Sequence, residues 1–201
     1  MGILRTVWRS RLRRVAPCLW ALGFGALPVA HAVEPAQSAL AAPSAEYQIK
    51  AVFLFNFAQF IEWPPGTFCN ASAPIVIGVL GSDPFGSYLD KLVEGERIGD
   101  HPVVVRRYGR VEDIADCGIL FISRSETAGL DAIMARLNGR RLLTVGDVDV
   151  FNLSGGMVRF STEHGKIRLR INIAAARAAD LRISSRLLAH ATIVSVGKGA
   201  P

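Results

Sequence analysis

Acidic residues are absent from the first 32 positions, whereas five arginines lie there: Arg5, Arg9, Arg11, Arg13 and Arg14. The rest of the chain holds 18 basic and 17 acidic side chains, so the formal charge of +6 falls to +1 when this segment is set aside. A protein that binds nucleic acid neutralises phosphates with a clustered excess of Lys and Arg. The remainder lacks that excess, and we therefore predict no nucleic-acid partner.

The same segment lacks an apolar run long enough to cross a bilayer, for which about 20 residues are needed. Its apolar run, Val15–Ala30, is shorter and contains two prolines. A basic stretch, a short apolar run and small residues at positions 30 and 32 are together typical of a secretory signal peptide. We predict that residues 1–32 are a signal peptide, cleaved after Ala32, and that the protein is exported. Retention of the segment is the alternative.

Cysteine is scarce, and one of the three cysteines, Cys18, lies in the predicted signal peptide. The two that remain are Cys69 and Cys117. In an oxidising compartment an even number of cysteines tends to pair, which predicts a disulfide between them. Two separate buried thiols are the alternative. No His or Asp lies at ligand spacing from either cysteine, so a metal site is not predicted.

The sequence also lacks the usual catalytic motifs. It has no GxSxG elbow, no HxxxH or HxH pair, and neither of the glycine-rich nucleotide motifs GxGxxG and GxxxxGK[ST]. Asp147 and Asp149 follow a predicted strand, where α/β folds often place functional groups, but the pair also fits turn and capping chemistry. We predict no catalytic residue, no metal, no cofactor and no enzyme activity.

Beyond a predicted flexible leader at residues 33–44, residues 45–201 form one domain with alternating helical and strand patterns. The predicted helices are Tyr47–Ile61, Phe85–Val93, a short one at Val111–Ala115, Thr127–Leu137, Ile173–Ala179 and Ser185–Val196. The predicted strands are Ile75–Leu80, Pro102–Tyr108, Gly118–Ser123 and Leu142–Val145. Such alternation predicts an α/β fold with a mostly parallel central sheet, flanked by helices on both faces.

A hairpin is predicted around His164-Gly165. With a turn there, Phe160 faces Leu169, and one register sorts both strands into an apolar and a polar face. We therefore predict an antiparallel hairpin at the edge of the sheet. Its polar face carries a basic stripe, which is either a solvated edge that discourages aggregation or a contact surface. The stripe consists of Arg159, Arg168 and Arg170.

The first predicted helix is apolar on nearly all sides. A helix of this kind is either deeply buried or covered by a partner. Core packing accounts for most of its side chains, and a dimer or partner surface that takes two or three of its rings is the alternative. The candidate contacts are Phe53, Phe57, Phe60 and, just beyond the helix, Trp63.

Six blocks of sequence resemble a known family, in the same order along the chain. The first is YQIKAVFLFNFAQFIEWP at residues 47–64. The others are IGVLGSDPFG, CGILFIS, LTVGD, GGMVRF and KIRLRIN, at residues 77–86, 117–123, 143–147, 155–160 and 166–172. Through these blocks the chain resembles the YfiR family, small periplasmic proteins of Gram-negative bacteria.

The resemblance implies regulation instead of catalysis. YfiR-like proteins bind the periplasmic domain of an inner-membrane diguanylate cyclase of the YfiN type and repress it, and an outer-membrane lipoprotein of the YfiB type relieves the repression. By this resemblance we expect a periplasmic, homodimeric repressor without a cofactor, which lowers cyclic di-GMP and controls biofilm. A periplasmic small-solute sensor that feeds another membrane sensor or kinase is the alternative.

The resemblance also bears on the cysteines. Cys69 and Cys117 match the positions of a disulfide found in the family. Some family members have a second cysteine pair, which this chain lacks. The extent of redox control is therefore left open.

Overall fold

The structure of the protein is a computed structural model, and it describes residues 43–70 and 72–195. The predicted signal peptide lies outside the described residues, as do residues 33–42 of the predicted leader. Ser44, the last residue of that leader, caps the first helix, because its hydroxyl oxygen accepts a hydrogen bond of 3.4 Å from the backbone N–H of Tyr47. The first helix therefore begins at Ala45, where the sequence places the start of the domain.

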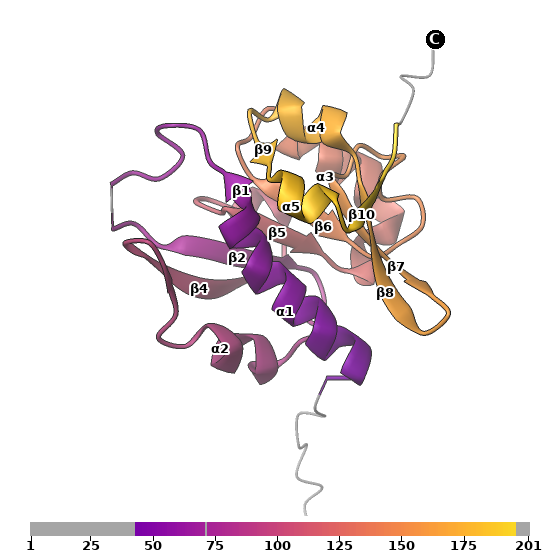
Figure 1. Ribbon diagram of the computed structural model, residues 1–201, viewed down its shortest axis with the longest axis horizontal. Coiled ribbons are helices and arrows are strands. Elements are labelled where there is room, and N and C mark those ends of the chain that lie inside the picture. The colour runs from indigo at the N-terminus through magenta and orange to yellow at the C-terminus, as the bar shows by residue number, and fades with distance from the viewer. Residues whose placement is uncertain (1–42, 71, 196–201) are drawn as a thin grey trace, which may run out of the picture. The chain divides into compact units, whose positions relative to one another are not determined.

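An eight-stranded sheet organises the described part of the chain (Figure 1). Its strands are β2 (Ile75–Leu80), β3 (Arg97–Ile98), β4 (His101–Tyr108), β5 (Ile119–Ile122), β6 (Leu143–Gly146), β7 (Val158–Glu163), β8 (Lys166–Ile171) and β10 (Ala191–Ile193). In space they follow the order β10-β8-β7-β6-β5-β2-β4-β3. The run from β4 to β7 is parallel throughout, and β8 is antiparallel to β7. The predicted α/β fold with a mostly parallel sheet is confirmed.

Helices cover both faces of this sheet. On one face lie α1 (Ala45–Phe60), α2 (Ser87–Val93), α4 (Ile173–Ala178) and α5 (Ser185–Leu188), and on the other lies α3 (Leu130–Leu137). The central strands β2, β5 and β6 are buried on both sides, as expected for a parallel sheet between two layers of helices. Ile75, Ile77 and Val79 of β2 contribute to the core beneath α1, whereas Leu80 contributes to the core beneath α3.

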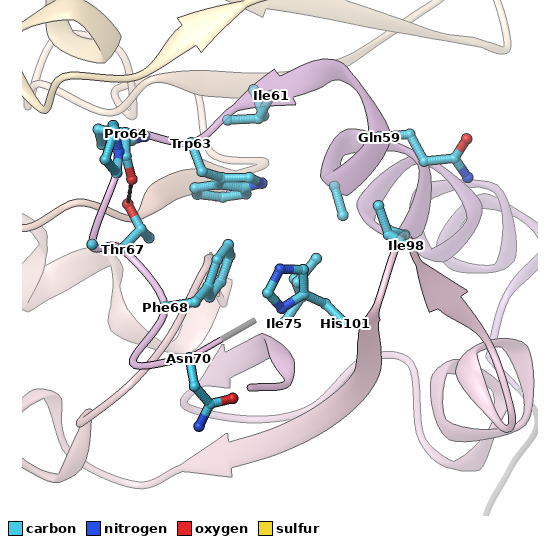
Figure 2. Close-up of a pocket in the computed structure, with 13 residues that line it drawn as sticks. Gln59, Ile61, Trp63, Pro64, Thr67, Phe68, Asn70, Ile75, Ile98 and His101 are labelled. Carbon is cyan, nitrogen blue, oxygen red and sulfur yellow. Dashed lines mark hydrogen bonds between the residues drawn. The ribbon is translucent and has the colours of Figure 1, made fainter. Parts of the chain in front are cut away.

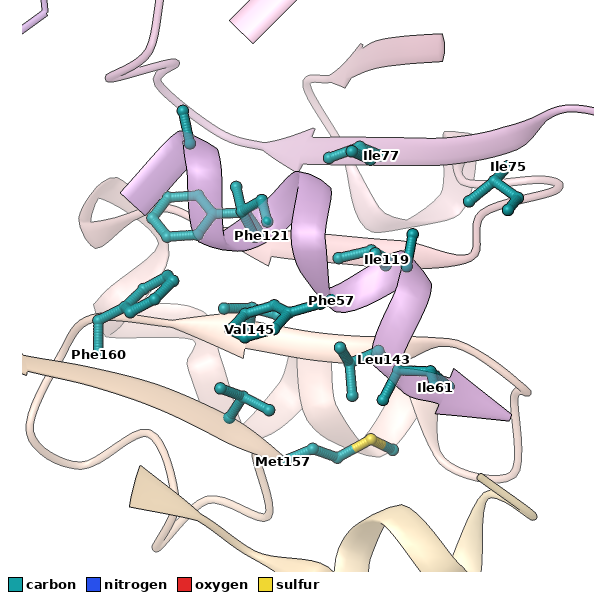
Figure 3. Packing of buried hydrophobic residues seen from close by; sticks show 14 of the residues in the cluster. Phe57, Ile61, Ile75, Ile77, Ile119, Phe121, Leu143, Val145, Met157 and Phe160 are labelled. Atoms are coloured by element: carbon teal, nitrogen blue, oxygen red, sulfur yellow. The ribbon is translucent and has the colours of Figure 1, made fainter. Parts of the chain in front are cut away.

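The larger core lies between α1 and the sheet (Figure 3). Phe57 points from α1 toward Val145 of β6, and Ile119 and Phe121 of β5 lie beside them. All four side chains are fully buried. Their packing fixes α1 across the sheet and thereby places the side chains of the candidate site.

The hairpin has the register that the sequence predicts. Phe160 pairs with Leu169, and Arg159 lies opposite Arg170. His164 and Gly165, with φ values of 51° and 72°, form the turn, and two successive positive φ angles are typical of a type I′ turn. One further strand, β10, continues the sheet beyond β8.

Two helix predictions need correction at their ends. The predicted helix over Ser185–Val196 is wrong over residues 189–195, because residues Ala191–Ile193 form β10 and pair with β8. That pairing satisfies backbone groups along β8, a tertiary gain that short-range periodicity does not indicate. The first three residues of the predicted helix over Thr127–Leu137 belong to a 3₁₀ segment, Arg124–Gly129.

A small second sheet closes the end of α1. It pairs β1 (Ile61–Glu62) with β9 (Arg182–Ile183) in antiparallel fashion. Ser184 N donates a hydrogen bond of 2.9 Å to Phe60 O, which extends the connection. The C-terminal end of α1 and the start of α5 are therefore held side by side.

Candidate functional site

A groove of about 740 Å³ lies between α1, β8 and α5. We call it the α1–α5 groove. Its floor is mainly apolar and consists of Phe53, Phe57, Phe60, Ile167, Leu169 and Leu187. Its polar rim includes Asn56, Glu163, Arg168, Arg186 and His190. An apolar floor with a polar rim is the usual anatomy of a protein-binding surface.

Helical spacing brings the aromatic rings of this groove together. Phe53 and Phe57 are four residues apart, so they lie on the same side of α1. Both rings pack on Phe160 of β7 with centroids 5.9 Å away, and the Phe57 and Phe160 rings are stacked. Phe57 is fully buried, so it supports the floor from below, whereas Phe53 and Phe60 are half-buried. The half-buried rings are the ones available to a partner.

The rim of the groove carries free positive charge. Arg168 and Arg186 are exposed, and neither guanidinium forms an ion pair with a residue that the structure describes. Glu163, by contrast, accepts a hydrogen bond of 3.0 Å from Arg170 Nη2, and this bond lowers the pKa of Glu163. Among the described residues, the groove therefore has two arginines without an ion pair at its rim and one carboxylate that is already engaged.

The structure brings some of the predicted contact residues together and separates others. Phe53, Phe57, Phe60 and Arg168 all line the α1–α5 groove. Trp63 lies beyond the helix, in a different pocket. The predicted basic stripe is divided, because Arg159 and Arg170 line a separate cavity and each is paired with a carboxylate.

The pocket at Trp63 has a volume of about 550 Å³ and aromatic walls (Figure 2). The rings of Trp63 and Phe68 meet edge to face at 5.7 Å, and Phe68 lies 4.7 Å from the His101 ring. His101 Nδ1 is 2.7 Å from the Ala73 carbonyl oxygen, which assigns a proton to Nδ1 because a carbonyl only accepts. Trp63 Nε1 is buried and has no hydrogen-bond partner among the described residues. The pocket thus offers an apolar stacking surface with one free donor.

The two cysteines are free in the structure, yet both line one small cavity of about 130 Å³. Cys69 is exposed, in the loop before β2. Cys117 is held next to β2 because Gly78 leaves room for it; a Cβ at Gly78 would lie 2.8 Å from the Cys117 sulfur. Burial raises the pKa of Cys117 to about 12, so its thiol is protonated at neutral pH. The predicted disulfide stays a prediction.

The most unusual polar group is buried under the first turns of α1. Lys50 is only 1% exposed, although lysine is rarely buried without a partner. Its Nζ lies 2.6 Å from Asp147 Oδ2 and 2.6 Å from Glu46 Oε1. The Asp147 side chain, which follows β6 directly, is 0% exposed. A buried lysine and a buried aspartate therefore neutralise each other between α1 and the sheet.

Further donors converge on the same carboxylate oxygen. Tyr47 donates its hydroxyl proton to Asp147 Oδ2 over 2.9 Å, and Arg124 Nε lies 3.2 Å from that oxygen. Burial and the Asp147 charge raise the pKa of Tyr47 to about 12, so Tyr47 is a donor at neutral pH. We call Glu46, Tyr47, Lys50, Arg124 and Asp147 the ionic cluster.

Sequence reasoning missed this cluster. In the sequence, Lys50 is one of the few polar residues in an apolar helix, and Asp147 fits the capping chemistry of a turn. The signal was the lysine itself, since a helix that is apolar on nearly all sides buries any charge it carries, and a buried charge needs a partner. The partner is 97 residues away and is identified only by the fold.

The part of the chain that the structure describes shows neither a metal-binding cluster nor a membrane-spanning helix. Within residues 43–70 and 72–195, no group of three or more His, Cys, Asp and Glu side chains is placed to hold a metal ion. No helix in those residues is long and apolar enough to cross a membrane.

Comparison with known proteins gives one match and one negative result. The sequence model of the YfiR/HmsC-like family matches residues 47–192, which is most of the chain. A search of curated proteins finds no significant match. The matched region contains the eight-stranded sheet except the last residue of β10, α1 from Tyr47 onward, the ionic cluster except Glu46, and the α1–α5 groove. The chain therefore belongs to the YfiR/HmsC-like family, a family of regulators in cyclic di-GMP signalling rather than of enzymes.

Proposed function

We propose that the protein is a periplasmic repressor of an inner-membrane diguanylate cyclase of the YfiN type. It binds the periplasmic domain of the cyclase, lowers cyclic di-GMP and so limits biofilm. Family membership supports regulation in this pathway. The observation that carries the mode of binding is the α1–α5 groove, where Phe53, Phe60 and Arg168 offer apolar surface and unpaired charge side by side.

Repression requires unequal binding to two states of the cyclase. The protein must bind the inactive conformation more tightly than the active one, and the difference in binding free energy sets the extent of repression. The groove favours a partner segment with aromatic or aliphatic side chains for the floor and a carboxylate for Arg168 and Arg186. A YfiB-type outer-membrane lipoprotein relieves repression by competing for the protein.

Export precedes this function. We propose that residues 1–32 direct export and are removed after Ala32, so that the domain reaches the periplasm. There Cys69 and Cys117 form a disulfide, and two copies associate as a homodimer. The disulfide is supported by the cavity that the two thiols share. Mass spectrometry of unreduced peptides tests it: a Cys69–Cys117 cross-link is expected, and two alkylatable thiols in the exported protein contradict it.

A complementation experiment tests repression. Deleting the gene in a strain that holds the cognate cyclase raises cyclic di-GMP, and the wild-type gene restores the low level. Phe60→Ala, which removes half-buried groove surface, fails to restore it. Val52→Ala is the matched control, because Val52 is 38% exposed on the same helix and does not line the groove. Unchanged cyclic di-GMP after deletion refutes the proposed repression.

The second candidate function is a periplasmic small-solute sensor. It is favoured by the pocket at Trp63, whose buried Nε1 lacks a partner among the described residues while aromatic rings line the space beside it. A flat heterocycle with a hydrogen-bond acceptor fits this chemistry. In a thermal-shift screen of small solutes, such a ligand raises the Tm of the wild type by linkage, and Trp63→Phe removes the shift. A library that leaves the wild-type Tm unchanged argues against the sensor.

A further inference from the structure

A separate cavity of about 520 Å³ lies at the carboxyl ends of β5 and β6, beside the hairpin. Its charged lining consists of Arg124, Asp147, Asp149, Arg159, Glu163 and Arg170. Arg124 begins the segment just after β5, and Asp147 directly follows β6. In parallel α/β sheets, ligands bind outside the carboxyl ends of the strands. The position and volume are those of a small-molecule site.

Three polar atoms of this lining are buried without a hydrogen-bond partner among the described residues. They are Asp147 Oδ1, Arg159 Nε and Arg170 Nε. The other atoms of the same groups are engaged: Asp147 Oδ2 by the ionic cluster, Arg159 Nη1 by Asp149 Oδ1 at 2.8 Å, and Arg170 Nη2 by Glu163. Buried polar atoms are nearly always paired, so each free one indicates a missing partner.

The free atoms differ in chemistry. Asp147 Oδ1 is an acceptor, and its side chain is 0% exposed, whereas the two guanidinium nitrogens are donors. The lining as a whole carries three guanidinium groups and three carboxylates. A simple anion is attracted by the arginines but repelled by the carboxylates, and a simple cation is attracted by the carboxylates but repelled by the arginines. A molecule that carries one positive and one negative group can pair with both the arginines and the carboxylates.

We propose that this cavity binds a small zwitterion. Its ammonium group donates to Asp147 Oδ1, and its anionic group, a carboxylate or a phosphate, accepts from Arg159 and Arg170. Asp147 then joins the ligand to Lys50 and to the start of α1. The site goes beyond the proposed repression, and it depends on neither a cyclase nor the α1–α5 groove.

Isothermal titration of the exported form, residues 33–201, tests the proposal. The probes are the L-amino acids one by one, O-phosphoethanolamine, and the single-charge compounds acetate, inorganic phosphate and ethylamine. We expect one or more of the zwitterions to bind at least tenfold more tightly than every single-charge compound. An amino acid among the binders identifies the carboxylate class, and O-phosphoethanolamine identifies the phosphate class. Absence of zwitterion binding, or equal binding of acetate, phosphate or ethylamine, overturns it.

Variants locate the binding site. Arg170→Gln weakens binding of the preferred zwitterion at least tenfold. Lys166→Gln is the matched control, because Lys166 is exposed on the same face of β8 and lines neither the cavity nor the groove. Asp147→Asn disturbs the ionic cluster and with it folding, so Arg159→Gln serves as the second test. If Arg170→Gln and Arg159→Gln both bind as the wild type does, the zwitterion does not occupy this cavity and the proposal fails.

Discussion

The two halves of α1 are attached to the domain by different forces. The first half is held by charge, because Lys50 and Tyr47 converge on Asp147 below the helix. The second half is held by rings, with Phe57 stacked on Phe160 and Phe53 packed beside them. A buried ion pair holds its two side chains in one position, because moving either charge away leaves the other buried without a partner. Apolar contacts tolerate small shifts of the side chains. The charged half anchors the helix, and the aromatic half leaves surface for a partner.

The anchor should dominate the stability of the domain. Lys50→Met removes the cation from a buried pair, so that Asp147 keeps only Tyr47 and Arg124 as partners. We expect the free energy of unfolding to fall by about 3–5 kcal/mol, the usual result of breaking a buried pair. Urea unfolding of the exported form measures this. The double variant Lys50→Met/Asp147→Leu should recover part of the loss, and a loss below about 1 kcal/mol for the single variant contradicts the anchor.

Tyr47 contributes a smaller part of the same anchor. Tyr47→Phe keeps the ring, which packs edge to face on Phe85 at 5.6 Å, and deletes only the hydroxyl that donates to Asp147. A hydrogen bond to a charged group contributes about 1.5–3 kcal/mol, so we expect a loss at the lower end of that range. Urea unfolding at neutral pH measures it. No loss of stability means that Arg124 and Lys50 satisfy Asp147 without Tyr47.

The same tyrosine makes stability depend on alkaline pH. Its pKa is raised from 10.0 to about 12, first by burial and then by the Asp147 charge, so the folded chain holds this proton more tightly than the unfolded chain. The resulting stability is complete below about pH 10 and is lost as the pH rises toward 12. After allowance for the exposed part of the ring, we expect a loss of about 1 kcal/mol. Tyr47→Phe, followed by urea unfolding across this window, should show a shallower decline; an identical slope contradicts the assignment.

Loss of a ring from the aromatic half of α1 should destabilise the domain less than loss of Lys50 does. Phe60→Ala removes a half-buried ring, for which we expect about 1 kcal/mol of destabilisation, well below the loss at Lys50. Val52→Ala, on the exposed side of the same helix, should change stability by no more than about 0.5 kcal/mol. Thermal unfolding of both variants checks the ranking. If Phe60→Ala costs as much as Lys50→Met, the second half of α1 is also an anchor and the contrast between the halves is lost.

Much of the fold could be predicted because its signals are local. The runs Ile75–Leu80 and Gly118–Ser123 are short, apolar and bounded by turn residues, and they contain β2 and β5. Strict alternation around His164-Gly165 fixed the register of the hairpin. β10 could not be predicted, because its three residues carry no pattern of their own and become a strand only by pairing with β8.

The candidate site was predictable in composition but not in geometry. The rings of α1 and the arginines of the hairpin were identified as contact residues, yet only the fold shows that Arg168 joins Phe53 and Phe60 while Arg170 does not. The ionic cluster depends on a contact between α1 and the end of β6, far apart in sequence. Local patterns carry no information about that contact.

The proposal that the aromatic half of α1 binds a cyclase can be tested by titrating the exported form with the periplasmic domain of a YfiN-type cyclase from the same organism. We expect saturable binding that weakens at least tenfold in Phe60→Ala and is unchanged in Val52→Ala. Circular dichroism of both variants confirms that they are folded. Binding of equal strength in Phe60→Ala, or no binding by the wild type, contradicts the claim.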